Sequence, residues 1–434
     1  MEDNSEQTPR PRPFSRPSQV SDAPPRGRMP SWALGAVLSL IVLAAWALFL
    51  QLAPPPETIA PAALSTSATS ATPAEPVAAD APVAPAAANT LRLLLWRNVI
   101  PAEIIAGFEA ESGLKVTVTA YDTTEQLGAL IDAGTLAADA AVVSGAGVKR
   151  LLTADLLAPL PPLAAAPSLD PAIIARTGVY DPGNGHAAVV QWGTLGLAFD
   201  AAKVAAALGN NAIDSWALLF DADAMAKLAA CGVQIIDSPA GVFPIALTHL
   251  GRPADSASAE DTEAAARAWE AVRPSIGKFA NAGIVDGLAE GKLCFALTTS
   301  GDAYQARRKA QAANSGAGGP DIRYVAPKEG TVVWYALAAV PKASANPTGA
   351  AKFADYLLRP DVAARLSNAQ GLANAVPASA GALKADLKED PSYMPPPAAF
   401  AAFTPEVEPS PAAAELRNRF WQLINTPTPT PTTP

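Results

Sequence analysis

The chain has 434 residues and a formal net charge of −9, and half of its residues are apolar. This length suffices for one large or two medium-sized domains. No basic block is long enough to indicate nucleic-acid binding. The acidic balance is compatible with an extracytoplasmic protein and weakly favours a cationic ligand. Only two histidines, His186 and His249, are present, so we predict no metal centre and no cofactor.

The N-terminal part predicts a membrane anchor. Residues 1–30 are polar and rich in Pro, Arg and Ser, which indicates a disordered cytoplasmic segment. Residues 31–52 carry no charge and provide the ~20 apolar residues that a transmembrane helix needs. Arg26 and Arg28 precede this run, so the positive-inside rule places the remainder of the chain in the periplasm of an inner-membrane protein. The alternative is a cleaved signal peptide, whose apolar region is usually shorter, about 7–15 residues.

The rest of the chain divides into a linker, a folded region and a tail. Residues 53–90 are dominated by Pro, Ala, Thr and Ser, a composition that cannot form a core and predicts an extended linker. Residues 91–425 are the predicted folded region, and 426–434 form a Thr/Pro tail. Cys231 and Cys294 are the two cysteines. Outside the cytoplasm a disulfide is the first expectation, with two buried free thiols as the alternative.

Strands and helices are predicted to alternate through the folded region. An apolar run at 91–96 is a strand, and a helix follows from Pro101 to Gly113, which ends it. The alternation of apolar and polar residues at 114–119 predicts a half-buried strand. Further elements are predicted as a helix ending at Gly134, strands at 140–143, 233–236, 293–297, 321–326 and 331–340, and helices at 262–272, 301–313 and 350–358. This order predicts two α/β lobes with mostly parallel sheets and a ligand site between them.

Several segments, in the same order along the chain, resemble periplasmic putrescine/spermidine-binding proteins. The similar segments are LRLLLWRNVIPAEIIAGFEAESGLKVTV from residue 91, YDPGNGHAAVVQWGTLGLAFD (180–200), DSWALLFD (214–221), CGVQIIDSP (231–239), GKLCFALTTSGDAYQA (291–306), PKEG (327–330), LLRPDVAARLSN (357–368) and LRNRFWQLIN (416–425). The resemblance covers essentially all of 91–425.

This resemblance implies a two-lobed periplasmic-binding-protein fold of type II, here with an N-terminal transmembrane helix. Lobe 1 is expected at about 91–195 and 331–372, and lobe 2 at about 196–330 and 373–425. The implied function is delivery of a small cationic or zwitterionic ligand to an ATP-driven permease of the ABC type in the inner membrane, without enzymatic chemistry. The resemblance also implies that Cys231 and Cys294 are paired.

The resemblance also implies which residues line the ligand site. The predicted ligand-binding residues are Trp96, Asn98, Ser144, Thr299, Asp302, Trp334 and Tyr335. Asn98 stands where the family usually has an amine-binding aspartate, and Thr299 stands where it has a tryptophan. A glutamate expected after DSP is replaced by Ala240 and Gly241, and an aspartate expected after Tyr335 is Ala336.

A late tyrosine of the family is also replaced, by Leu372. Asp302 is then the single acid that the motifs assign to the site, although capping of the helix at Gly301 is an alternative role. Each carboxylate removed takes away a charge-assisted bond worth about 1.5–3 kcal/mol. We therefore expect a ligand with one ammonium group, or a neutral polar ligand, rather than an unmodified polyamine. Arg97 also allows an acidic group on the ligand.

Two other classes of function are alternatives. The loss of several expected ligand-binding carboxylates, the predicted anchor and the predicted linker are all compatible with a different role. In that role the chain is a membrane-tethered scaffold or sensor module that uses the fold without transport. An enzyme is the weakest alternative, because no G-x-S-x-G, H-E-x-x-H or P-loop motif occurs in the sequence.

Overall fold

The computed structural model describes residues 89–121, 124–134, 136–210, 213–313, 319–406 and 408–426. The predicted cytoplasmic segment, the predicted transmembrane helix at 31–52 and nearly all of the predicted linker lie outside these ranges, as does the tail after Thr426. Among the helices of the described ranges, none combines the length and the apolar character needed to cross a bilayer.

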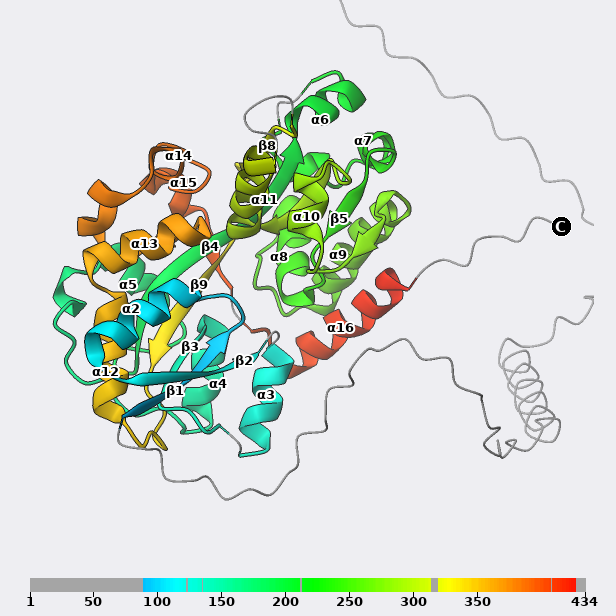
Figure 1. Ribbon diagram of the computed structural model, residues 1–434. Helices are drawn as coiled ribbons and strands as arrows, with labels where there is room; N and C mark the ends of the chain where they lie inside the picture. The colour runs from blue at the N-terminus through cyan, green and yellow to red at the C-terminus, as the bar shows by residue number, and fades with distance from the viewer. Residues whose placement is uncertain are drawn as a thin grey trace, which may run out of the picture. The chain divides into compact units, whose positions relative to one another are not determined.

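Two long strands organise the fold. Strand β4 (Ala187–Asp200) pairs antiparallel with β9 (Val332–Ala339), and every residue of both strands is buried. They lie in the middle of a sheet with the strand order β2-β1-β3-β9-β4-β7-β5-β6. Figure 1 shows both strands running between two groups of elements. We name these groups lobe 1 and lobe 2.

Lobe 1 is built on the side of β9 that carries β3. Its remaining strands are β1 (Thr90–Trp96), β2 (Lys115–Tyr121), β3 (Ala140–Ser144), β10 (Ala373–Asn374) and β11 (Thr404–Pro405). Its helices are α2 (Ala102–Ser112), α3 (Thr124–Asp132), α4 (Gly145–Thr153), α5 (Pro171–Thr177), α12 (Pro347–Leu357) and α13 (Pro360–Gln370). The apolar residues of these elements form one continuous core.

Lobe 2 is built on the C-terminal half of β4. Its strands are β5 (Val233–Ile235), β6 (Lys278–Phe279), β7 (Phe295–Thr299) and β8 (Ile322–Val325). Its helices are α6 (Ala201–Leu208), α7 (Ala222–Ala229), α8 (Pro239–His249), α9 (Ala259–Val272), α10 (Ile284–Ala289), α11 (Ser300–Ala313) and α16 (Pro411–Asn425). Two short helices, α14 (Ala385–Lys388) and α15 (Pro397–Ala401), precede α16.

The cores of the two lobes meet inside the shared strands. On β4 the core of lobe 1 extends to Trp192 and that of lobe 2 begins at Leu195. On β9 the division falls between Val332, in lobe 2, and Val333, in lobe 1. The α/β two-lobed architecture predicted from the sequence is therefore confirmed.

The prediction of mostly parallel sheets was wrong. The strands β1, β2 and β3 are parallel to one another, as are β5, β6 and β7. However, β4 pairs antiparallel with β7, β8, β9 and β10, and β3 pairs antiparallel with β9. The sheet is mixed because the chain passes between the lobes along β4 and returns along β9 in the opposite direction.

Strand β2 is also more exposed than its sequence pattern predicted. It lies at the edge of the sheet and pairs with β1 alone among the described strands. Val118 is 47% exposed, and most residues of β2 are exposed. An alternating pattern identifies a strand, but it does not say whether anything covers the apolar face.

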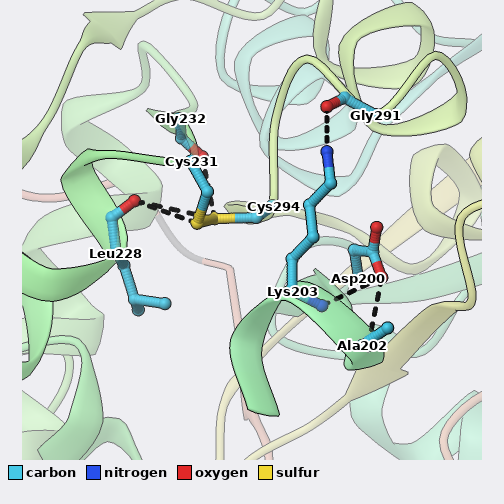
Figure 2. The surroundings of a disulfide bond; sticks show 8 residues. All are labelled: Asp200, Ala202, Lys203, Leu228, Cys231, Gly232, Gly291 and Cys294. Carbon is cyan, nitrogen blue, oxygen red and sulfur yellow. Dashed lines mark hydrogen bonds between the residues drawn. A yellow bond between two sulfur atoms is a disulfide. The ribbon is translucent and has the colours of Figure 1, made fainter. Parts of the chain in front are cut away.

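A disulfide joins neighbouring strands of lobe 2. Cys231 precedes β5, Cys294 precedes β7, and their Cα atoms are 5.5 Å apart. Figure 2 shows the disulfide with Leu228 and Gly232 beside it. The backbone N–H of Cys294 donates to the Gly232 carbonyl at 3.0 Å, and Cys231 N–H donates to the Leu228 carbonyl at 3.0 Å. Gly232 has φ 94°, and a Cβ atom there would lie 2.4 Å from the Lys292 carbonyl oxygen. The expected pairing of the cysteines is confirmed.

We predict that the double substitution C231S/C294S lowers the free energy of unfolding by about 2–4 kcal/mol, because the cross-link restricts the unfolded chain. Chemical denaturation of the parent and the variant measures this difference. Treatment with dithiothreitol should lower the midpoint of the parent and leave that of the variant unchanged. A variant whose midpoint without dithiothreitol equals that of the oxidised parent would show that the disulfide contributes nothing to stability.

Candidate ligand-binding site

Two tryptophans predicted to contact ligand lie against each other. Trp96 is the last residue of β1 and is partly exposed, whereas Trp334 lies on β9 and is 6% exposed. Their ring centroids are 5.3 Å apart and the rings meet edge to face at 78°. Ligands of open α/β sheets bind at the carboxyl ends of strands, so the end of β1 provides a suitable aromatic surface.

The Trp334 ring lies where the two lobes approach closely. A Cβ atom on Gly193 would lie 2.7 Å from the Trp334 ring, 2.8 Å from the Leu372 side chain and 2.9 Å from Ser300 Oγ. Ser300 begins α11 of lobe 2, whereas Leu372 belongs to the core of lobe 1. The absence of a side chain at Gly193 therefore allows groups from both lobes to meet over β4.

Tyr335 faces away from Trp334. Successive residues of a strand point to opposite sides of the sheet, and Tyr335 is 0% exposed. Its ring lies 6.1 Å from that of Tyr180 in the core of lobe 1. Burial raises the pKa of the Tyr335 hydroxyl to about 12, and nearby Arg176 opposes this shift. Tyr335 thus occupies a core position and does not share the surface formed by Trp96 and Trp334.

Asn98 lies in the turn that follows β1. Its backbone is left-handed, with φ 61°, a conformation that asparagine tolerates better than most residues. The residue is exposed, and its carbonyl oxygen accepts a hydrogen bond from the Gln370 side chain at the end of α13. Asn98 is therefore held in the turn beside the end of β1, and its role toward a ligand stays a prediction.

Ser144 and Thr299 end strands in lobe 1 and lobe 2, and both cap the helix that follows. Ser144 Oγ accepts from Gly147 N–H at 3.1 Å at the start of α4. Thr299 Oγ1 accepts from Asp302 N–H at 3.1 Å at the start of α11. Both side chains are partly exposed at strand ends.

The carboxylate of Asp302 takes part in the same cap. It accepts from Thr298 Oγ1 at 2.9 Å and also from the backbone N–H of Thr299. Together with the Thr299 bond this forms a reciprocal capping box. Burial raises the pKa of the Asp302 carboxyl, and the hydrogen bonds from Thr298 and Thr299 oppose that shift. These contacts are the capping role that the sequence allowed for Asp302, and they bind its carboxylate within lobe 2.

A separate pocket lies beside the segment that returns to lobe 2 near the C-terminus. Its lining residues are Pro244, Ala254, Asp255, Val332, Thr404, Pro405, Glu406, Pro409 and Arg417. Burial raises the pKa of the Glu406 carboxyl to about 7. Arg417 is 2% exposed and donates to the Ser256 carbonyl at 2.7 Å. None of the seven predicted ligand-binding residues lines this pocket, so we treat it as separate from the site at the strand ends.

We predict that Asp302→Ala lowers the free energy of unfolding by about 1 kcal/mol, the usual contribution of a helix cap. A matched control is Asp221→Ala, because Asp221 caps α7 through the N–H groups of Asp223 and Ala224. Chemical denaturation of both variants should give losses of similar size. Full stability in Asp302→Ala would contradict the capping role.

Comparison with known proteins identifies the class of protein that this fold represents. The fold is similar to that of a solved structure of the spermidine/putrescine ABC transporter substrate-binding protein PotD from Streptococcus pneumoniae. That structure aligns with a TM-score of 0.66 and 20% identity, covering 78% of this chain and 100% of that one. The Tp0655 (TpPotD) lipoprotein of Treponema pallidum aligns with a TM-score of 0.64 and 20% identity, covering 77% and 99%. These similarities establish the fold.

Sequence comparison establishes the family. Residues 103–396 match the family described as bacterial extracellular solute-binding protein. The chain is 34% identical over 344 residues to the putrescine-binding periplasmic protein PotF of Escherichia coli, covering 78% of this chain and 92% of that protein. It is 32% identical over 345 residues to a putrescine/agmatine-binding protein of Pseudomonas aeruginosa, covering 79% and 93%. The chain belongs to the family of bacterial extracellular solute-binding proteins.

Proposed function

We propose that this protein is an extracytoplasmic receptor that delivers a small amine related to the polyamines to an ABC-type permease. The observation that carries this proposal is the Trp96–Trp334 pair at the end of β1, in a chain whose relatives include putrescine-binding proteins. Aromatic faces attract a cation by about 0.5–2 kcal/mol and also cover an alkyl chain. The receptor performs no covalent chemistry on its ligand.

The proposed ligand carries one ammonium group. Three positions where the resemblance implies carboxylates hold Asn98, Ala240 and Ala336. The Asp302 carboxylate is bound by Thr298 and Thr299. A second ammonium group buried without a carboxylate would be costly. A ligand with a single cationic end and an alkyl body suits the remaining aromatic surface better.

We predict that a calorimetric titration of the full chain in detergent detects binding of at least one ligand from a panel of putrescine, spermidine and 4-aminobutyrate. Trp96→Ala should weaken that binding about tenfold, the effect of losing one cation–π contact with its apolar area. Phe220→Ala is the control, because Phe220 stacks on His249 at the C-terminal end of α8. Equal affinities of the parent and Trp96→Ala would refute the aromatic site.

We further propose that residues 31–52 anchor a type II binding-protein fold to the inner membrane, with the lobes in the periplasm. The uncharged segment, the preceding arginines and the Pro-rich linker support this arrangement. An anchored receptor is held close to its permease, which raises the effective concentration of the partner.

The anchor predicts that the protein keeps its full mass of 44.3 kDa and stays in membranes washed with alkaline carbonate. Mass spectrometry of the membrane and soluble fractions measures both properties. A shorter chain in the soluble periplasmic fraction would instead support cleavage of a signal peptide.

A further inference from the structure

A buried glutamine on β4 lacks the hydrogen bonds that its side chain needs. Gln191 is 0% exposed, and neither its amide nitrogen nor its amide oxygen has a partner among the described residues. Each unmet buried polar group costs a protein measurable stability. Native structures contain few such groups, and each requires an explanation.

The strand register places Gln191 on the face of the sheet that carries the candidate site. Gln191 pairs with Ala336 on β9, and Ala336 pairs in turn with Ser144 on β3. One step along the same face, Gly193 pairs with Trp334. Cross-strand partners share a face of the sheet, so the Gln191 amide lies on the same side as the Trp334 ring and Ser144.

The backbone beside Gln191 is irregular. The pairing of β4 with β9 shifts by one residue between Val189 and Gln191, which is a β-bulge. Bulges change the direction in which side chains point and are common next to functional sites. The indole N–H of Trp334 is a second buried donor without a partner among the described residues. Two donor groups, the Gln191 amide nitrogen and the Trp334 indole nitrogen, and one acceptor, the Gln191 amide oxygen, thus lie on this face without a described partner.

Another buried glutamine provides a contrast. Gln234 on β5 is 5% exposed, and its amide nitrogen donates to the carbonyls of Ala280 at 2.8 Å and Ala282 at 3.0 Å. The side-chain amide nitrogen of Gln234 therefore has hydrogen-bond partners within the fold, whereas that of Gln191 has none among the described residues. If Gln191 served only to fill space, an apolar side chain of equal length would do so at lower cost.

We propose that Gln191 is a specificity-determining residue that binds the uncharged end of the ligand. This inference rests on the proposed function. The amide offers a donor and an acceptor together, and the matching ligand group is another amide, with its own carbonyl oxygen and N–H. Ala336, opposite Gln191, offers no carboxylate for a second ammonium group, and Ser144 Oγ already accepts from Gly147. The ligand class is an alkylamine whose far nitrogen is acylated.

The experiment compares putrescine with N-acetylputrescine, which has the same alkyl chain but an amide at one end. Calorimetric titration of the full chain in detergent should show that N-acetylputrescine binds at least about tenfold more tightly, as expected for one additional net hydrogen bond. Gln191→Met keeps the length of the side chain and removes its polar atoms. This variant should lose the preference, with about a tenfold or greater loss for N-acetylputrescine and little change for putrescine.

Thermal unfolding without ligand supplies a second readout. Gln191→Met should unfold at a higher temperature than the parent, because the unmet amide is gone. Gln234→Met is the matched control: it should unfold at a lower temperature and keep the preference for N-acetylputrescine. Failure of both amines to bind, together with failure of spermidine and 4-aminobutyrate, would remove the proposed function itself, whereas failure of N-acetylputrescine alone would overturn the role of Gln191. Binding of putrescine with equal or higher affinity, unchanged by Gln191→Met, would overturn only the role of Gln191.

Discussion

The antiparallel pairing of β4 with β9 is the constraint on which the rest of the structure depends. Both strands are buried along their whole length, and each contributes residues to the cores of both lobes. Their register fixes which side chains lie next to one another at the junction. Trp334 must lie opposite Gly193, and Gln191 opposite Ala336. The arrangement of these four residues therefore follows from backbone pairing, whereas Trp96 and Asn98 are placed by β1 and the turn that follows it.

Carboxylates near the strand ends are used mainly for structure. Asp302 belongs to a capping box, and Asp237 accepts a hydrogen bond from the Trp421 indole at 2.6 Å. A carboxylate engaged in this way is poorly placed to neutralise a ligand cation, because the bonds that hold it would have to be shared or broken. Recognition of a cationic group then falls to aromatic rings, which attract positive charge without the cost of burying a negative one.

Local patterns predicted much of the fold. Ile104 and Phe108 form the buried side of α2, and Gly113 ends that helix in a left-handed conformation, as the sequence indicated. The pairing of Cys231 with Cys294 was also predicted, because the sequence has two cysteines in a region expected to lie outside the cytoplasm. Strand β4 (Ala187–Asp200) was not among the predicted strands, and its partners could not be predicted either, because an apolar run contains no information about the strands it pairs with. The mixed sheet is a consequence of chain topology, which is non-local.

In the candidate site, too, some residues could be predicted from local sequence patterns and others depend on the pairing of distant strands. Trp96 and Trp334 were predicted and lie together, whereas Tyr335 was assigned to the same surface although it follows Trp334 directly. The two-residue period of a strand excludes that arrangement, so this misassignment was avoidable. Gln191 gave no signal in the sequence, because a single glutamine in an apolar strand reads as an ordinary interruption. Its importance depends on the register with Ala336 and on the absence of a described partner.

The segment of β4 from Val189 to Gly196 carries residues of the candidate site and also runs between the two lobes. A bulge separates Val189 from Gln191, and glycines follow at Gly193 and Gly196. Bulges bend strands, and glycine in a strand marks a bend or a close approach. A Cβ atom at Gly196 would lie 2.3 Å from the Val325 carbonyl oxygen, so close packing explains that glycine. Gly193 is explained in the same way, because a Cβ atom there would lie 2.7 Å from the Trp334 ring, so both glycines mark places where neighbouring groups pack closely against β4.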